Sequence, residues 1–362
     1  MSGKLSVSRQ KDKMAEKNNK ITLLEVADKC IITQHTEAQK EFSLSSGAEN
    51  KNRDYLHLSR SESKDLSLPK LIKLCWETEF DLSGIVQISN SQDFSGNVWE
   101  FAAAQGENFV FIHSLRPDTD YYWRVVDSAK LQVSEVRTFR TADEIPRYIY
   151  VEGVSNVRDI GGYSACNGSK KVKYDLLYRG GELNSHMTAT LRALNFLENN
   201  LKLKSILDLR TADELKNLPN NGHALSNQVK HINIPILAYK QIENPEQQKL
   251  YAEVFRAIIN SENLPTYLHC WGGADRTGTF VFLLLALLGV DEETILHDYE
   301  LTSLSIWDIR SRNGEWFTEL KTALRKFSDA DDFQTQSRDY FISCGISDME
   351  INKLRELFLT DI

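Results

Sequence analysis

The sequence predicts a multidomain protein in which an all-β sandwich precedes an α/β domain with a central sheet covered by helices. Two observations predict this order. Residues 21–143 hold short β-rich runs broken by polar turns, and from residue 146 apolar strands alternate with helical stretches. The length of 362 residues also exceeds that of one typical domain. The predicted boundaries are 1–20 for a disordered polar tail, 21–143 for the sandwich and 146–362 for the α/β domain.

Five β-rich runs define the predicted sandwich. Their brevity and spacing are typical of such a fold. They contain no cluster of titratable residues, so we expect a scaffold or a docking module for a protein partner. The runs are Lys70–Glu77, Gly84–Ser89, Asn108–Ser114, Tyr121–Ser128 and Gln132–Thr141.

One stretch of this region is more specific. Leu115-Arg116-Pro117-Asp118-Thr119-Asp120-Tyr121-Tyr122-Trp123-Arg124-Val125 resembles the L-x-P-x-T-x-Y-x-x-x-V signature of fibronectin type III domains. The resemblance implies a fibronectin type III-like sandwich in which Tyr121 forms the corner that pins a loop to its strand. Another kind of β-sandwich stays open.

Composition and charge exclude several function classes. The hydrophobic fraction of 41% and the charged fraction of 26% are those of an ordinary globular protein. The net charge of -8 argues against a nucleic-acid partner or an anionic membrane surface. No apolar run has the length of a transmembrane helix, and no apolar core of signal-peptide length follows the charged first twenty residues.

The cysteines carry no signal of a disulfide framework or a zinc site. There are five, and they are scattered without a C-x-x-C pair or a cluster at metal-ligand spacing. We expect a reducing compartment, with the cytoplasm as the default. An extracytoplasmic location stays open if the true N-terminus is missing. We expect neither a cofactor nor a metal.

The α/β domain is predicted from strands and helices that follow one another. Pro146 marks the link between the two domains. The predicted strands are Ser205–Leu209 and His231–Ile236, and the predicted helices are Met187–Asn199, Pro245–Asn260, Arg276–Leu288, Glu292–Ser303, Glu315–Phe327 and Met349–Leu359.

The chemistry is predicted to lie in the loop between an apolar strand and a buried helix. Cys270 opens this loop and the helix begins at about Arg276. Gly272 and Gly273 allow the backbone to curl so that N–H groups point inward. Such a nest at a helix N-terminus binds an anion. The backbone of Trp271, Gly272, Gly273 and Ala274 is therefore the predicted phosphate-binding site.

Cys270 is the predicted nucleophile of this site. The inward N–H groups, the helix N-terminus and Arg276 all favour its thiolate form. Arg276 offers a planar fork that matches two phosphoryl oxygens. Thr277 is expected to donate its hydroxyl proton to the sulfur when the thiolate departs. A structural buried cysteine beside a glycine turn is the alternative.

The whole loop then resembles a known family. His269-Cys270-Trp271-Gly272-Gly273-Ala274-Asp275-Arg276-Thr277-Gly278 matches the Cys-x5-Arg-[Ser/Thr] signature of cysteine-dependent protein tyrosine and dual-specificity phosphatases. Four more segments are similar to motifs of the bacterial and fungal branch that groups with lipid-active phosphatases. They are Gly153–Tyr163, Leu177–Leu183, Leu207–Arg210 and Asp298–Thr302. The resemblance covers nearly all of residues 146–360 and implies a hydrolase that works through a cysteinyl-phosphate.

The resemblance implies that Asp275 is the general acid, which protonates the leaving oxygen and then acts as base. Asp208, at the end of a predicted strand, is the rival. The alternatives are that Asp275 only orients Arg276 or a neighbouring loop, and that Asp208 is a capping residue that pairs with Arg210. Arg158 and Asp159 either approach the substrate from the Gly161-Gly162 turn or brace the loop through an internal ion pair. His269 is expected to hydrogen-bond the loop backbone.

The substrate is predicted to be a phosphotyrosine protein or peptide. Lipid-active members of the branch often carry Lys where this chain has Ala274. Trp271 either stacks on an aromatic leaving group or packs under the loop. One alternative is a phosphoinositide or inositol phosphate phosphatase, with a basic rim supplied by Arg158, Arg179, Arg210 and Lys240. The other is a phosphate-binding module without turnover.

Overall fold

The structure is a computed structural model, and it describes residues 20–24, 26–44, 64–79, 82–128 and 133–362. The predicted polar tail lies outside the described residues, apart from Lys20, and so does Gln132, the predicted start of a strand. The chain forms two compact units that interleave along the sequence. One comprises residues 1–29, 73–111 and 121–138, and the other comprises 30–72, 112–120 and 139–362.

This division differs from the boundary predicted at residues 143–146. Residues 30–72 and 112–120 belong to the same compact unit as the α/β region. Polar contacts explain the difference, because the Glu144 carboxylate accepts from the amides of Gln34 and His35. The side chain of Arg147 likewise donates to the carbonyl oxygen of Ser114 at 2.9 and 2.7 Å.

The first unit consists of antiparallel strands. β4 (Gly84–Ser89) lies between β5 (Val98–Ala102) and β7 (Asp120–Asp127) and pairs antiparallel with both. In a second sheet β3 (Ile72–Thr78) lies between β1 (Ile21–Leu23) and β6 (Phe109–Ile112). Side chains on alternate positions of β1, β3, β6 and most of β7 are buried, with Trp76 and Trp123 the largest. The predicted strands at 70–77, 84–89, 108–114 and 121–128 are confirmed as strands.

The second unit is built on a five-stranded sheet of order β14-β13-β15-β12-β9. Four strands are parallel: β14 (Lys230–Asn233), β13 (Ser205–Asp208), β15 (Thr266–His269) and β12 (Leu177–Gly180). β9 (Arg158–Asp159) pairs antiparallel with β12 at one edge. The parallel register aligns His269 with both Asp208 and Gly180, so three strands end side by side.

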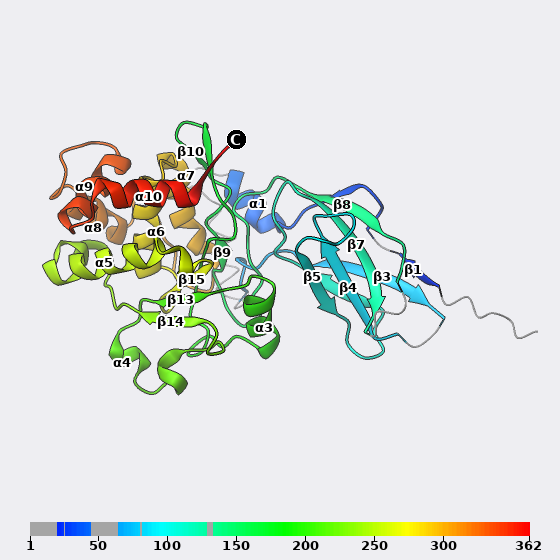
Figure 1. The fold of residues 1–362 in the computed structure, drawn as a ribbon. Coiled ribbons are helices and arrows are strands. Elements are labelled where there is room, and N and C mark those ends of the chain that lie inside the picture. Colours follow the sequence, from blue (N-terminus) through cyan, green and yellow to red (C-terminus); the bar gives the residue numbers. More distant parts are fainter. Residues whose placement is uncertain (1–19, 25, 45–63, 80–81, 129–132) are drawn as a thin grey trace, which may run out of the picture. The chain divides into compact units, whose positions relative to one another are not determined.

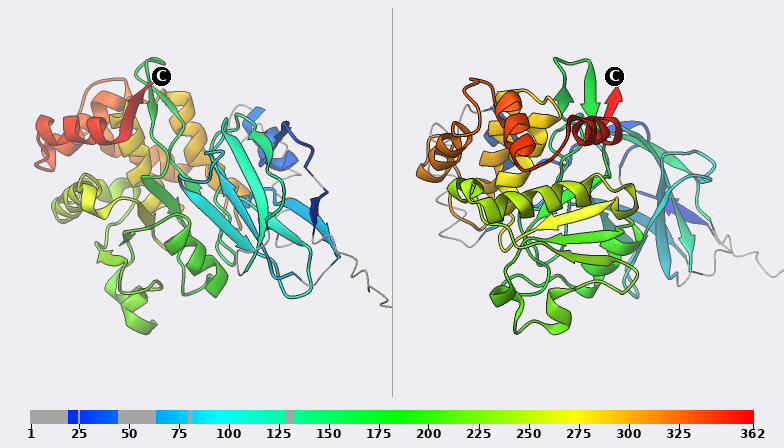
Figure 2. Two further views of the ribbon diagram at one scale, coloured as in Figure 1. Left: turned by 45° about the vertical axis from the view of Figure 1, so that its right-hand side comes forward. Right: turned by 60° about the vertical axis from the view of Figure 1, so that its left-hand side comes forward.

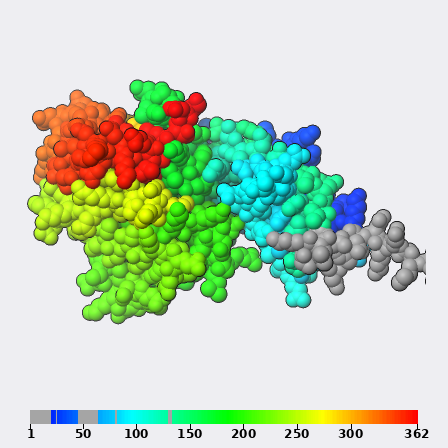
Figure 3. All heavy atoms as spheres, in the orientation of Figure 1, coloured from blue at the N-terminus to red at the C-terminus, as the bar shows by residue number. Residues whose placement is uncertain are grey.

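Helices cover this sheet. The helix α6 is central, because every residue from Thr277 to Leu287 is buried. Helices α5, α6 and α10 lie on one side of strands β13 to β15 (Figures 1 and 2). The space-filling view shows α10 beside α5 on the surface (Figure 3), where Arg256 donates to Glu350 at 2.8 Å. The α-helices that follow the first unit are α3 (Leu191–Asn199), α4 (Ala212–Leu215), α5 (Pro245–Ile258), α6 (Arg276–Leu287), α7 (Glu292–Glu300), α8 (Glu315–Leu324), α9 (Phe333–Ser343) and α10 (Asp348–Phe358).

Shorter elements complete the second unit. β2 (Cys30–Ile32) pairs parallel with β8 (Arg137–Thr141), and α1 (Glu37–Leu44) follows β2. A small sheet joins β10 (Ser164–Ala165), β11 (Lys170–Val172) and β16 (Leu359–Asp361). The 3-10 helices are η1 (Pro219–Gly222), η2 (Tyr239–Glu243), η3 (Ser261–Asn263) and η4 (Leu301–Leu304). The sequence did not predict α1, α4 or α9.

Candidate active site

The predicted loop lies where β15 ends and α6 begins. Cys270 directly follows β15 and is only 2% exposed, and Arg276 is the first residue of α6. The loop thus sits at the carboxyl ends of the parallel strands, which is where open α/β sheets bind ligands. Loop, strand and helix match the prediction from the sequence.

Four successive carbonyl groups of the loop are hydrogen-bonded from outside. Each accepts from a different neighbour: the Cys270 oxygen from His269 Nδ1 at 2.9 Å, the Trp271 oxygen from the Glu182 amide at 2.8 Å, the Gly272 oxygen from Asn156 Nδ2 at 3.1 Å and the Gly273 oxygen from Arg179 Nη2 at 2.7 Å. The His269 contact agrees with the prediction that this ring bonds the loop backbone. These contacts turn the carbonyl oxygens away from the centre of the loop.

The amide groups of the loop are left for a ligand. Among the residues that the structure describes, no acceptor takes the N–H groups of residues 271–275. Consecutive amides in a curled loop form a concavity that attracts anions, and the N-terminus of α6 adds its partial positive charge. The arrangement suits a tetrahedral oxyanion held above Cys270.

Two glycines make this curl possible. Gly273 has a φ of +66°, and a Cβ there would lie 2.3 Å from the carbonyl oxygen of Gly180 at the end of β12. A Cβ on Gly272 would lie 2.8 Å from the ring of Trp307. The loop backbone therefore lies too close to its neighbours for any side chain at these positions.

Arg276 is held by a carboxylate that sequence reasoning missed. Its Nη1 and Nη2 atoms each donate to one oxygen of Glu214 at 2.7 Å. Glu214 also caps the start of α4, because Thr211 donates its amide proton to the same carboxylate at 2.7 Å. Burial raises the pKa of Glu214, but the bonds from Arg276 and Thr211 outweigh this and lower it to about 2.

Asp275 has two partners of its own. Arg310 donates from Nε and Nη2 to the two carboxylate oxygens at 2.9 and 3.0 Å, and the Tyr239 hydroxyl donates to Oδ1. The Asp275 side chain is still 40% exposed. Burial, together with Tyr299 and Asp275, raises the pKa of Tyr239 above its ordinary value, so this phenol stays a donor. Neither Tyr239 nor Arg310 lies in a sequence pattern that would have revealed it.

Asp208, the rival acid, is enclosed. Arg210 donates to it from Nε at 2.9 Å and from Nη2 at 2.7 Å, and His231 Nε2 lies 3.1 Å from Oδ2. Burial raises the pKa of Asp208, but neighbouring His269, His231 and Arg210 hold it well below its ordinary value. Its side chain is fully buried. The structure thus places a buried carboxylate at this strand end, with its ionised form favoured by these neighbours.

Arg158 and Asp159 lie behind the loop rather than in it. Both are buried. Arg158 donates to Asp298 of α7 at 2.8 Å, and Arg179 donates to the same carboxylate at 2.7 Å. Asp159 pairs with Arg147 at 3.1 Å. Three motif segments therefore meet in one buried network around Asp298. Arg158 pairs with Asp298 and Asp159 with Arg147, so both are enclosed rather than open to a substrate, and a bracing role for them stays a prediction.

The remaining predicted residues differ in exposure. Ala274 is buried, whereas Trp271 is 41% exposed and its ring centroid lies 4.2 Å from that of His186. Thr277 Oγ1 is buried and has no hydrogen-bond partner within the described ranges. Within the same ranges no group of His, Cys, Asp and Glu side chains could hold a metal ion, and no helix combines the length and apolarity needed to cross a bilayer.

These features define a cysteine-type phosphatase site on an α/β scaffold. Residues 149–360 match the family described as "Tyrosine phosphatase family". The match covers more than half of the chain, which belongs to this family of phosphatase hydrolases.

Individual relatives are more distant. A protein of Cupriavidus necator, assigned by its name to the tyrosine-protein phosphatases, is 28% identical over 170 residues. The alignment covers 40% of this chain and 59% of that relative. The core catalytic domain of the PP-IP phosphatase SIW14 from S. cerevisiae, solved with citrate, is 17% identical with a TM-score of 0.30, over 52% of this chain and 93% of that one. A second structure of the Siw14 catalytic core has a TM-score of 0.29 and 17% identity, over 49% and 92%.

Proposed function

We propose that this protein hydrolyses phosphate monoesters through a cysteinyl-phosphate on Cys270, and that its substrate is phosphotyrosine in a protein or peptide. One observation carries the proposal. Four successive loop carbonyls accept hydrogen bonds from outside the loop, whereas no acceptor in the described part of the chain takes the amides of residues 271–275 around a buried cysteine. Arg276 follows at the helix start. This is the arrangement that a phosphoryl group attacked by sulfur requires.

The first step transfers the phosphoryl group to sulfur. The Cys270 thiolate attacks phosphorus, an S–P bond forms and the bond from phosphorus to the tyrosine oxygen breaks. The loop amides and Arg276 hold the equatorial oxygens as their charge develops. Asp275 donates a proton to the departing phenoxide, which leaves as tyrosine.

The second step releases phosphate. A water attacks phosphorus while Asp275, now ionised, takes its proton. The S–P bond breaks and inorganic phosphate forms. Thr277 donates its hydroxyl to the departing sulfur, and the absence of another partner for its buried Oγ1 among the described residues supports this role. The thiolate of Cys270 is thereby regenerated.

Asp275 is a better candidate than Asp208 for the acid. The Asp275 side chain is exposed at the loop, where a leaving group can reach it. Asp208 is fully buried, so a leaving group cannot reach it. The contacts from His269, His231 and Arg210 that lower its pKa favour its ionised form, which cannot donate a proton. In the proposed mechanism it orients Arg210.

The charges around the loop support a substrate with one phosphate. Arg158, Arg179 and Arg210, which would form a basic rim, are buried and paired with carboxylates. Lys240 is exposed but pairs with Glu319 at 2.8 Å. A multiply phosphorylated inositol would need several accessible cations, whereas the exposed Trp271 suits an aromatic leaving group.

The β-rich unit and the compartment complete the proposal. We propose that the strands around the buried Tyr121 form a fibronectin type III-like module that docks a protein partner. The nucleophilic role of Cys270 requires a reduced thiol, so the protein would work in a reducing compartment such as the cytoplasm.

The test compares wild-type protein with Cys270→Ser on a phosphotyrosine peptide at mildly acidic pH, with chelator and reductant present. Cys166→Ser, a thiol outside the loop, is the control. Turnover that survives chelation, persists in the control and vanishes in Cys270→Ser is expected. If the wild-type protein hydrolyses only phosphoinositides or inositol phosphates, the proposed substrate is wrong. If it hydrolyses none of these compounds, the proposal that it is an enzyme is wrong.

A further inference from the structure

Ser67, a serine far from the loop in sequence, is hydrogen-bonded to Asn156, a residue that contacts the loop. Ser67 is 2% exposed and lies in the same compact unit as the α/β sheet. Its hydroxyl donates to Asp65 Oδ1 at 2.6 Å and accepts from the backbone N–H of Asn156 at 2.8 Å. Asp65 therefore fixes the direction of the hydroxyl proton and leaves a lone pair for Asn156.

Asn156 passes this contact on to the loop. It adopts a left-handed φ of +65°, a conformation that few residue types tolerate. Its Nδ2 donates to the Gly272 carbonyl at 3.1 Å, and its Oδ1 accepts from Arg158 at 2.7 Å. A chain of hydrogen bonds thus runs from Asp65 through Ser67 and Asn156 to the phosphate-binding loop.

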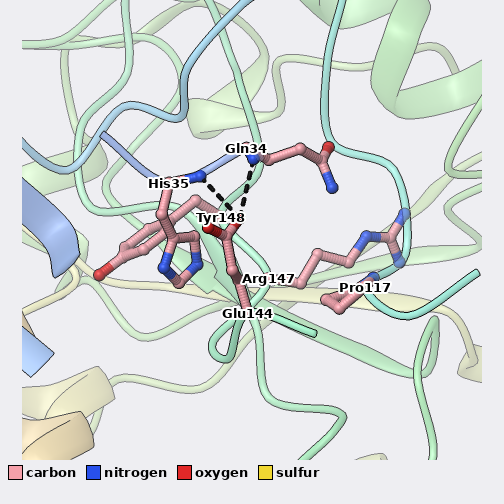
Figure 4. Close-up of a pocket in the computed structure, with 6 residues that line it drawn as sticks. All are labelled: Gln34, His35, Pro117, Glu144, Arg147 and Tyr148. Atoms are coloured by element: carbon pink, nitrogen blue, oxygen red, sulfur yellow. Dashed lines mark hydrogen bonds between the residues drawn. The ribbon is translucent and has the colours of Figure 1, made fainter. Parts of the chain in front are cut away.

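The segment that carries Ser67 is firmly attached. The Leu66 amide donates to the Leu304 carbonyl at 2.9 Å, and the fully buried Gln39 donates to the carbonyls of Leu66 and Leu68 at 3.0 and 2.8 Å. Further upstream, Glu144 accepts from the backbone of Gln34 and His35 in a small pocket lined also by Pro117, Arg147 and Tyr148 (Figure 4). Buried polar contacts of this number indicate that the segment around Ser67 is an integral part of the second compact unit.

We infer that Ser67 is a positioning residue for the phosphate-binding loop, supplied from outside the region that matches the family. The match begins at residue 149, so the family region alone lacks this contact. Without the Ser67 hydroxyl, the buried amide of Asn156 loses its acceptor and the left-handed turn relaxes. The Gly272 carbonyl then loses its donor, and the neighbouring amides turn out of line. The inference rests on the proposed role of the loop.

The experiment measures the inhibition constant of orthovanadate, an oxyanion that reports on the loop directly, together with kcat and KM for p-nitrophenyl phosphate. Ser67→Ala should weaken vanadate binding by about 10-fold and lower kcat in parallel. Ser205→Ala is the matched control. Ser205 is the first residue of β13, is also buried, and donates its hydroxyl to the Asn263 carbonyl oxygen at 2.8 Å. This substitution should lower the melting temperature and leave vanadate affinity within twofold of wild type.

A double-mutant cycle tests whether the effect of Ser67 reaches Gly272 through Asn156. Asn156→Gly accepts the positive φ and removes the contact with Gly272. Ser67→Ala should have no further effect on vanadate in that background. An unchanged effect there, or wild-type affinity in Ser67→Ala, would overturn the inference. Should Ser67→Ala fail to fold, Ser67→Cys keeps the size and weakens the acceptor, and the same readouts decide. A wild-type protein that neither binds vanadate nor turns over would instead refute the proposed function.

Discussion

Glu214 and Arg276 form a two-pronged ion pair, in which each terminal nitrogen of the guanidinium donates to one carboxylate oxygen at 2.7 Å. The pair fixes the plane of the arginine before any substrate arrives. Preorganised donors cost little to align at the moment of reaction. Glu214 is therefore predicted to act on phosphate binding, although it makes no contact with Cys270.

Glu214→Gln is expected to lower kcat/KM for p-nitrophenyl phosphate by about 10- to 100-fold. The amide keeps the shape of the side chain but turns one donor toward Arg276, so the guanidinium rotates away. Asp213→Asn, on the adjacent exposed position of α4, is the control and should behave as wild type. Steady-state kinetics that place Glu214→Gln within twofold of wild type would refute this role.

The same pair predicts a pH dependence of stability. The pKa of Glu214 is lowered from 4.5 to about 2 in the folded protein. The unfolded chain therefore binds a proton first as the pH falls, and the stabilising contribution is present above about pH 4.5 and lost as the pH approaches 2. Thermal unfolding should show a gap between wild type and Glu214→Gln at pH 6 that narrows toward pH 3. A gap that widens on acidification would contradict the sign.

Asp275→Asn and Asp208→Asn separate the two candidate acids. Loss of a general acid is felt most with a strongly basic leaving group, so Asp275→Asn should lower kcat on phenyl phosphate by about 100-fold or more and far less on p-nitrophenyl phosphate. Asp208→Asn weakens one of the two carboxylate pairings of Arg210, the other being with Glu182, and should lower the melting temperature without that leaving-group dependence. If only Asp208→Asn showed the leaving-group dependence, Asp208 would be the general acid and Asp275 would not.

Tyr239→Phe removes a hydrogen bond to Asp275 and is expected to lower kcat on phenyl phosphate by about 3- to 10-fold. Tyr299→Phe is the matched control, because its hydroxyl lies 3.2 Å from that of Tyr239, whereas the hydrogen bonds to Asp275 come from Tyr239 and Arg310. Equal effects of the two substitutions on kcat would show that packing, rather than the bond to Asp275, is responsible.

Gly273→Ala should abolish vanadate binding, a loss of about 100-fold or more. The added methyl would lie 2.3 Å from the Gly180 carbonyl oxygen, so the loop must move. Gly106→Ala controls for the conformational penalty alone, because Gly106 has a similar φ of +80° and nothing within 4 Å of the added atom. Vanadate titration of both variants provides the measurement, and retained affinity in Gly273→Ala would refute the close approach.

Local pattern was enough to predict the strand, loop and helix around Cys270. Cys270, Gly272, Gly273 and Arg276 lie within seven consecutive positions, and a strand–loop–helix junction constrains all of them at once. The α/β class was predicted in the same way, from strand and helix patterns that alternate along the chain. Helix α9 was missed because its sequence, FQTQSRDYFIS, has few apolar residues at helical spacing.

The sequence by itself therefore predicted the nucleophile, the anion-binding loop and the family resemblance, since these depend on residues adjacent along the chain. Only the tertiary structure decided that Glu214 holds Arg276, that Arg310 holds Asp275, and that Asp298 gathers Arg158 and Arg179. It also decided that residues 30–72 share a compact unit with the loop. The physical reason is that these contacts join residues 35 to 140 positions apart, and strand order and helix packing alone bring such residues within hydrogen-bonding distance.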